Sequence, residues 1–217
     1  MKDLSKQFLT ESDRERIIAA VEEAEKHTAG EIVPMVVSTS YHYPMANVIG
    51  AAVLALPAAL VLALLIGGWL WIGGDNLWLF LGFFAVLFVV FHTIVKHTVW
   101  LKRWFVSQRE MDEEVEEAAV TDFYREALYR TRRATGVLIF ISIFEHKVWI
   151  LADRGINEKV EQSRWDDIIR KVVNRIKQKQ QALGICEAVE RVGKLLATHF
   201  PVQPDDTDEL RNLIVDA

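Results

Sequence analysis

The sequence lacks charge over a long internal stretch. Between Glu31 and Lys96 a single side chain, Asp75, carries a formal charge. Charged side chains belong mainly on water-facing surfaces, so a stretch without them is not expected to face water. It contains two apolar runs, at residues 46–72 and 77–95. Each run is near or above the roughly 20 residues that a helix needs to cross the hydrocarbon core of a bilayer.

Cysteine and clustered positive charge are also scarce. The one cysteine, Cys186, excludes an internal disulfide and agrees with a reducing compartment. The net charge is −5, and no basic stripe with interleaved aromatic residues lies outside the segment that follows the second apolar run. A nucleic-acid partner is therefore not expected.

Common catalytic motifs are missing as well. The chain has no Gly-x-Ser-x-Gly, no phosphate-binding glycine loop and no His-Glu-x-x-His. Nothing in the residues themselves therefore requires the protein to be an enzyme.

The two apolar runs predict a transmembrane helical hairpin over residues 46–95. The residues between them, Gly73-Gly74-Asp75-Asn76, are turn formers. A buried helical pair in a soluble core is the alternative, but such a core rarely needs so long a stretch with one charge. A signal peptide would lie nearer the N-terminus and have a shorter apolar region.

Aromatic and basic residues flank the hairpin, as is typical at the two faces of a bilayer. Residues 96–110 interleave the two kinds and predict an interfacial juxtamembrane helix that reaches anionic headgroups, with a plain helical connector as the alternative. The residues assigned to the membrane interface are Trp69, Trp71, Trp78, Trp100, Lys102, Arg103 and Trp104.

The positive charge also predicts the orientation of the hairpin. Lys96, Lys102, Arg103 and Arg109 follow the second run, whereas the turn carries no Lys or Arg. The positive-inside rule then places both termini and the soluble domain in the cytoplasm.

The segments outside the hairpin, 1–45 and 96–217, amount to about one domain. Thr10 and Asp13 form a capping box before a helix, and residues 32–37 form a buried strand that Pro34 pushes toward an edge or a bulge. After the hairpin we expect a helix over 111–133, and strands over 137–143 and 147–152 paired as an antiparallel hairpin. Two further helices follow, one capped by Ser163 with Asp166 and one over about 185–199.

These elements predict an α/β fold, in which a small mixed sheet is flanked by helices and a two-helix transmembrane hairpin is inserted. Residues 1–45 form the first part of the domain and residues 111–201 the second part. Residues 202–217 form an acidic tail.

Three carboxylates are the candidate metal ligands. Asp153 ends a predicted strand, and Asp166 and Asp167 lie in the first turn of the next helix. If they converge, their oxygens could hold a hard cation such as calcium. Helix capping and the helix dipole account equally well for Asp166 and Asp167.

Three motifs resemble a known family. They are Gly30-Glu31-Ile32-Val33, residues 135–142 (TGVLIFIS) and residues 148–156 (VWILADRGI). In order and spacing they resemble the TPM domain, which includes thylakoid-lumen phosphatase-like and photosystem II repair proteins. The chain is more closely similar to a bacterial branch of TPM-domain membrane proteins, with the hairpin inserted after the first strand. The resemblance implies an α/β sandwich and, in some members, calcium binding and acid phosphatase activity, while the predicted hairpin is expected to lie in the inner membrane.

Three functions follow as hypotheses. The first is a membrane-anchored TPM-domain protein that acts as a binding, assembly or accessory module, with the bilayer and a membrane or cytoplasmic protein as partners. The second is a calcium-dependent phosphatase-like enzyme. The third is a small transport subunit, which the scarcity of polar residues in the two spans disfavours.

Overall fold

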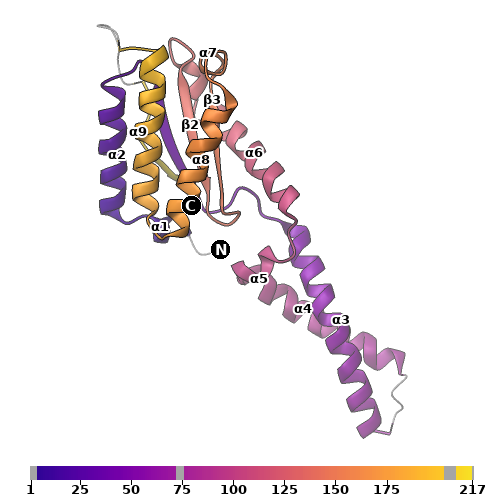
Figure 1. Cartoon of the computed structure of the whole chain (residues 1–217). Helices are drawn as coiled ribbons and strands as arrows, with labels where there is room; N and C mark the ends of the chain where they lie inside the picture. Colours follow the sequence, from indigo (N-terminus) through magenta and orange to yellow (C-terminus); the bar gives the residue numbers. More distant parts are fainter. Residues whose placement is uncertain (1–3, 72–75, 203–208, 217) are drawn as a thin grey trace. The chain divides into compact units, whose positions relative to one another are not determined.

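The computed structural model of the chain describes residues 4–71, 76–202 and 209–216 (Figure 1). The chain divides into two compact units. One comprises residues 42–111, and the other comprises the segments before and after them. Each unit is described by itself.

A four-stranded mixed sheet forms the centre of the second unit. Its strands are β1 (Glu31–Val37), β2 (Gly136–Ser142), β3 (Lys147–Ala152) and β4 (Ile214–Asp216), in the order β3-β2-β1-β4. β1 runs parallel to both of its neighbours, whereas β2 and β3 form an antiparallel hairpin. Every residue of β1 and β2 is buried, and both strands are apolar except for Glu31 and Ser142 at their ends.

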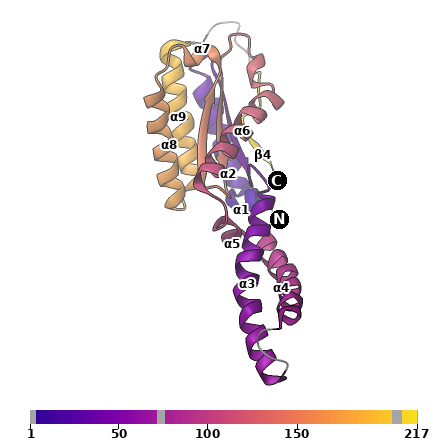
Figure 2. The same cartoon turned by 90° about the vertical axis from the view of Figure 1, so that its right-hand side faces the viewer.

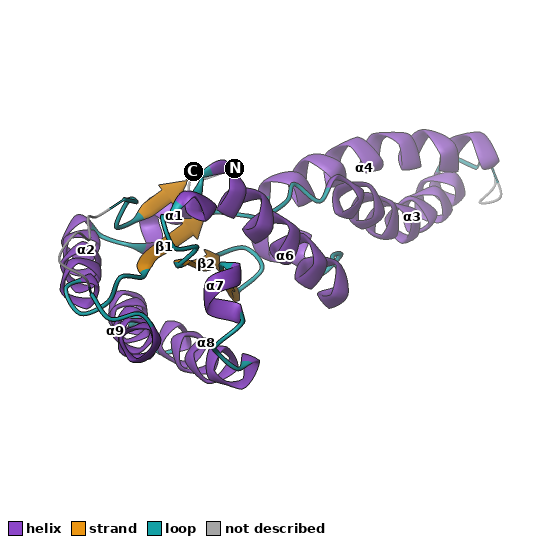
Figure 3. Cartoon of the chain, turned by 90° about the horizontal axis from the view of Figure 1, so that it is seen from above, coloured by secondary structure: helices purple, strands orange, loops and turns teal. Residues whose placement is uncertain are grey.

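Helices cover both faces of this sheet (Figures 2 and 3). One face carries α2 (Glu11–Glu25), α8 (Gln162–Lys177) and α9 (Gln181–His199) over a core that includes Ile139. The other face carries α6 (Gln108–Arg125) over a smaller core that includes Phe140. A short helix, α1 (Leu4–Phe8), precedes α2. The predicted mixed sheet flanked by helices is confirmed.

The helix after the hairpin and the helix cap differ from the expectations. α6 ends at Arg125 rather than Arg133, because Ala127 adopts a left-handed φ of 58° before the 3₁₀ turn η1 (Leu128–Arg130). α8 begins at Gln162 after Glu161, and no side chain caps it. The predicted Ser163–Asp166 cap is therefore wrong. The Thr10–Asp13 capping box is confirmed.

The end of the chain contains a strand that the sequence analysis did not predict. β4 lies within the segment assigned to the acidic tail, and it pairs with Met35–Val37 of β1. Its partner β1 is an interior strand rather than an edge strand. Pro34 is tolerated there because pairing with β4 begins only at the next residue. Residues 203–208, which carry much of the tail's acidic charge, lie outside the described residues.

The first unit holds two apolar helices, α3 (Pro44–Trp69) and α4 (Leu77–His97). Both are long and apolar enough to cross a membrane, judged by length and composition. Asn76 caps α4 by accepting a hydrogen bond from Leu79 N at 3.1 Å. The expected turn residues 73–75, with Asp75 among them, lie outside the described residues.

Small side chains form a buried stripe along α3. Ala51, Ala55, Ala59 and Ala63 recur at every fourth position and are at most 2% exposed, while large side chains such as Leu65 point outward. Helices in lipid pack closely through such small residues, because apolar side chains have no solvent to escape there. The two apolar helices can therefore form a hairpin.

The predicted interfacial residues are mostly exposed. Trp69, Trp71, Trp78, Trp100 and Trp104 are each at least 63% exposed. Arg103 is partly buried, and Lys102 is buried. It lies in α5 (Val99–Arg103), is 5% exposed and donates a hydrogen bond from Nζ to the carbonyl of His42. Its ammonium group is therefore engaged with the backbone of the same unit.

Candidate functional site: a polar cleft at the carboxyl end of the sheet

A cleft of about 580 Å³ lies where the parallel strands end. β1 ends at Val37 and β4 at Asp216, and both residues line it together with one side of α6. Ligands of open α/β sheets bind outside the carboxyl ends of the strands, so this is the position where a site is expected. The charged lining residues are Glu114, Glu117, Asp122, Arg125 and Asp216.

Arg125 is the centre of an ion-pair network in this cleft. Its Nη1 lies 3.2 Å from Asp122 Oδ1, and its Nη2 lies 2.7 Å from Asp216 Oδ2. Its Nε also lies 3.3 Å from Glu126 Oε1. The guanidinium thereby joins the last turn of α6 to the end of β4. Because Arg125 and Asp216 are half exposed, the pair between them is open to a ligand from solvent.

Asp122 is the buried member of the network. Its side chain is only 10% exposed. Burial raises the pKa of the Asp122 carboxyl, Arg125 opposes that shift, and the nearby carboxylates of Asp216 and Glu126 add to it. The folded domain therefore holds a carboxylate whose charged form is disfavoured, and groups of this kind cluster at functional sites.

Glu145 holds two residues that line the cleft, Thr39 and Ser40, by hydrogen bonds. This carboxylate is fully buried in the turn between β2 and β3. It accepts hydrogen bonds from Ser142 Oγ, from Thr39 Oγ1 at 3.2 Å and from Ser40 N at 3.0 Å. These bonds fix the segment that leaves β1. A buried carboxylate satisfied by several donors is a positioning device rather than a ligand group.

One lining hydroxyl has no partner of its own. Ser40 Oγ is buried and makes no hydrogen bond within the described part of the chain. Buried polar groups are nearly always hydrogen-bonded, so an unpartnered hydroxyl in the wall of a cleft has free capacity to bind a ligand.

The cleft has an excess of negative charge. Four carboxylates and one guanidinium line it. The carboxylates are spread along the cleft, and among the described residues no three His, Cys, Asp or Glu side chains are placed together to hold a metal ion. The arrangement therefore favours an extended cationic group, such as a lysine or arginine side chain, over a caged ion.

The structure does not bring the three predicted metal ligands together. Asp153 caps the short helix α7 (Arg154–Asn157), with Oδ1 accepting from Arg154 N at 2.6 Å and Oδ2 buried without a partner in the described residues. Asp166 is exposed on α8, and Asp167 pairs with Arg170. Asp153 serves as a helix cap and Asp167 is ion-paired, and in the described part of the chain no group of three metal-ligating side chains includes them.

Sequence reasoning missed the cleft. Asp122 and Arg125 lie within the helix expected over 111–133 and were not singled out, and Asp216 lay in the segment assigned to the acidic tail. One signal was available, because Thr39 and Ser40 directly follow a buried strand, where ligand-binding side chains are often found.

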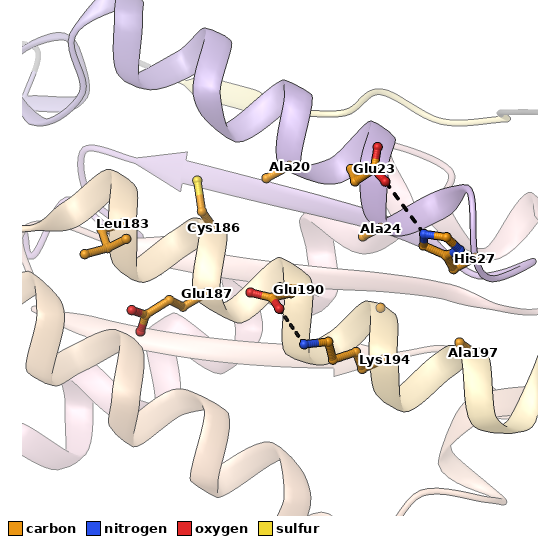
Figure 4. A pocket seen from close by; sticks show the side chains of 11 residues that line it. Ala20, Glu23, Ala24, His27, Leu183, Cys186, Glu187, Glu190, Lys194 and Ala197 are labelled. Carbon is orange, nitrogen blue, oxygen red and sulfur yellow. Dashed lines mark hydrogen bonds and ion pairs between the residues drawn. The ribbon is translucent and has the colours of Figure 1, made fainter.

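A second hollow, of about 510 Å³, lies between α2 and α9 (Figure 4). Its floor consists of small residues such as Ala20 and Ala24. Its charged groups are paired: Glu23 with His27 just after α2, Glu190 with Lys194 along α9, and Glu187 with Arg175 of α8. These pairs leave no convergent polar groups, so we interpret this hollow as the groove between two packed helices.

The comparisons with known proteins agree with the fold. Residues 101–195 match the family model of the TPM domain. The NMR structure of BA42 protein from the psychrophilic bacterium Bizionia argentinensis sp. nov. is similar, with a TM-score of 0.59 and 22% sequence identity over 98% of this chain and 97% of that chain. No curated protein sequence matches the chain. The resemblance to the TPM domain is thus confirmed by the family model over residues 101–195.

Proposed function

We propose that this protein is a membrane-anchored TPM-domain protein that binds a basic segment of a protein partner in its polar cleft, as an accessory or assembly module. The observation that carries the proposal is the excess of carboxylates around Arg125, with a buried Asp122 and an unpartnered Ser40 hydroxyl in the same cleft. A lysine or arginine of the partner would replace or join Arg125 between Asp122 and Asp216.

The anchor is the apolar hairpin. α3 and α4 have the length and composition of spanning helices, and their large side chains point outward. Lys96 lies in the last turn of α4 and Arg109 follows that helix, so the positive-inside rule supports an inner-membrane protein with both termini and the TPM domain in the cytoplasm. The partner is then a cytoplasmic protein or the cytoplasmic part of a membrane protein.

The TPM match also raises a phosphatase-like activity as the second candidate function. The polar cleft does not favour phosphatase activity, because a phosphate monoester carries negative charge and the lining carboxylates repel that charge. Binding of a cation is the interaction that the same charges stabilise.

The test uses the full chain in nanodiscs and a fluorescent peptide of alternating lysine and alanine. We expect saturable binding that weakens with salt, and a loss of about tenfold in affinity in the double variant Asp122→Asn and Asp216→Asn, equivalent to about 1.4 kcal/mol. Asp166→Asn is the matched control, because it removes an exposed carboxylate outside the cleft. The neutral amide suits position 122, where burial already disfavours the charge.

Equal affinity in the double variant and the control would overturn the proposal. Hydrolysis of p-nitrophenyl phosphate in the presence of calcium, lost in the double variant but not in the control, would favour the phosphatase instead.

A further inference from the structure

A pocket of about 400 Å³ opens at the same end of the domain but on the other face of the sheet. Phe140 lines the polar cleft, whereas the next residue, Ile141, lines this pocket. Side chains alternate between the faces of a strand, so the two sites are separated by the sheet itself. Ligand binding in this pocket is therefore independent of the polar cleft.

The walls of this pocket are apolar. They come from the end of β2 and the start of β3, from Phe8 of α1 and from the last turns of α8. Ile143, Val173 and Ile176 are only half buried there, although they pack against the main core. The core is therefore left open at this point, and apolar surface that could bind a ligand remains accessible.

The charged side chains described at the pocket are lysines, and one histidine accompanies them. Among the residues that the structure describes, no Asp or Glu lines it, whereas His146, Lys147, Lys177 and Lys179 do. The Lys147 ammonium pairs with Asp112 at 2.7 Å. Lys177 and Lys179 are exposed and form no ion pair within the described part of the chain. We call the site the lysine-rimmed pocket.

Lys179 occupies a conformation that usually belongs to glycine. Its φ is 59°, directly after the end of α8. Lys177, in the last turn, is accounted for by the negative end of the helix dipole. The same dipole favours a cation at position 179, but the backbone there favours glycine, which would relieve the strain of a positive φ. A lysine at this position is consistent with use of its ammonium group at the rim.

We propose that the lysine-rimmed pocket binds a single-chain anionic amphiphile of the fatty-acid type. The apolar walls take the hydrocarbon chain, and Lys177 and Lys179 hold the carboxylate at the rim. The volume lies near the lower end of the range for small-ligand sites, so it suits one acyl chain rather than the two of a phospholipid. Since no described carboxylate lines the pocket, such a head group meets no repulsion from its walls.

The test is photolabelling of the full chain in phosphatidylcholine nanodiscs with a diazirine analogue of lauric acid, followed by peptide mapping. We expect adducts on the segment that contains Val173 and Ile176. Unlabelled laurate should compete, whereas dodecanol, which lacks the charge, should compete at least about tenfold less well. Competition by dodecyl phosphate as strong as that by laurate would show that the rim recognises anionic heads in general.

The charge-reversal variant Lys177→Glu and Lys179→Glu should lower this labelling about tenfold. Both side chains are exposed, so the fold should be retained. Lys171→Glu is the control, because Lys171 is an exposed lysine of α8 that lines a different cleft. Equal labelling in the double variant and the control, or adducts confined to α3 and α4, would overturn the proposal.

Discussion

Replacing Arg125 with alanine tests the polar cleft most directly. The change leaves the Asp122 carboxylate, 10% exposed, without its cation. An unsatisfied buried polar group costs about 1–3 kcal/mol. The exposed pairs with Asp216 and Glu126 add little, since such pairs contribute about 0.2–1 kcal/mol. We therefore expect the variant to lose about 2–3 kcal/mol of unfolding free energy at neutral pH.

The loss should depend on pH. Burial already raises the pKa of Asp122, and Arg125 is the group that lowers it, so the pKa rises further in the variant. A carboxyl with a raised pKa destabilises the fold only when it is ionised, and protonation removes that cost. The difference between the wild type and the variant should therefore narrow as the pH falls from about 7 to about 4.5.

The assay is urea unfolding of the full chain in detergent micelles, followed by circular dichroism at both pH values. Arg170→Ala is the matched control, because Arg170 pairs with Asp167 on an exposed helix face. That control should change the unfolding free energy by less than about 1 kcal/mol. An Arg125 variant no less stable than the control, or an equal loss at both pH values, would refute the reasoning.

Three further predictions concern single positions. Gly136→Ala should cost about 1–3 kcal/mol in the same urea titration, because a Cβ there would lie 2.4 Å from the Leu128 carbonyl oxygen; an unchanged midpoint would contradict that contact. Lys179→Gly should raise the unfolding free energy by about 1 kcal/mol by relieving the left-handed backbone, and a loss would show that the lysine stabilises the fold. Burial raises the pKa of the Cys186 thiol, so iodoacetamide should react with it more slowly than with free cysteine at about pH 8, and urea should remove the difference.

Much of the fold could be predicted from local patterns. Short apolar runs predicted the positions of β1, β2 and β3, and long uncharged runs predicted the positions of α3 and α4. These signals are strong because burial on both faces of a strand, or along a whole helix, leaves little freedom in residue type. The elements that were missed or misplaced depend on contacts between distant segments. β4 has three residues and is fixed by pairing with β1, and α6 ends where Ala127 takes a left-handed conformation.

The candidate sites were less predictable for the same reason. Asp153 was singled out because it ends a strand, but its side chain caps α7. The polar cleft is made by residues from β1, from α6 and from the end of the chain, and the ion pair of Arg125 with Asp216 spans 91 residues. Only the folded sheet brings these groups together, so no single window of sequence contains the site.

The position of β1 has a consequence for biosynthesis. Both strands that pair with it are encoded after the apolar hairpin, and a hydrogen bond from Glu209 to Glu31 joins residues 178 positions apart. β4 must therefore leave the ribosome before the interior strand gains its second neighbour. The hairpin emerges first, so it can enter the bilayer while the sheet is still incomplete. Until β4 pairs, β1 keeps a bare edge, and an unpaired strand edge is a template for pairing with another chain.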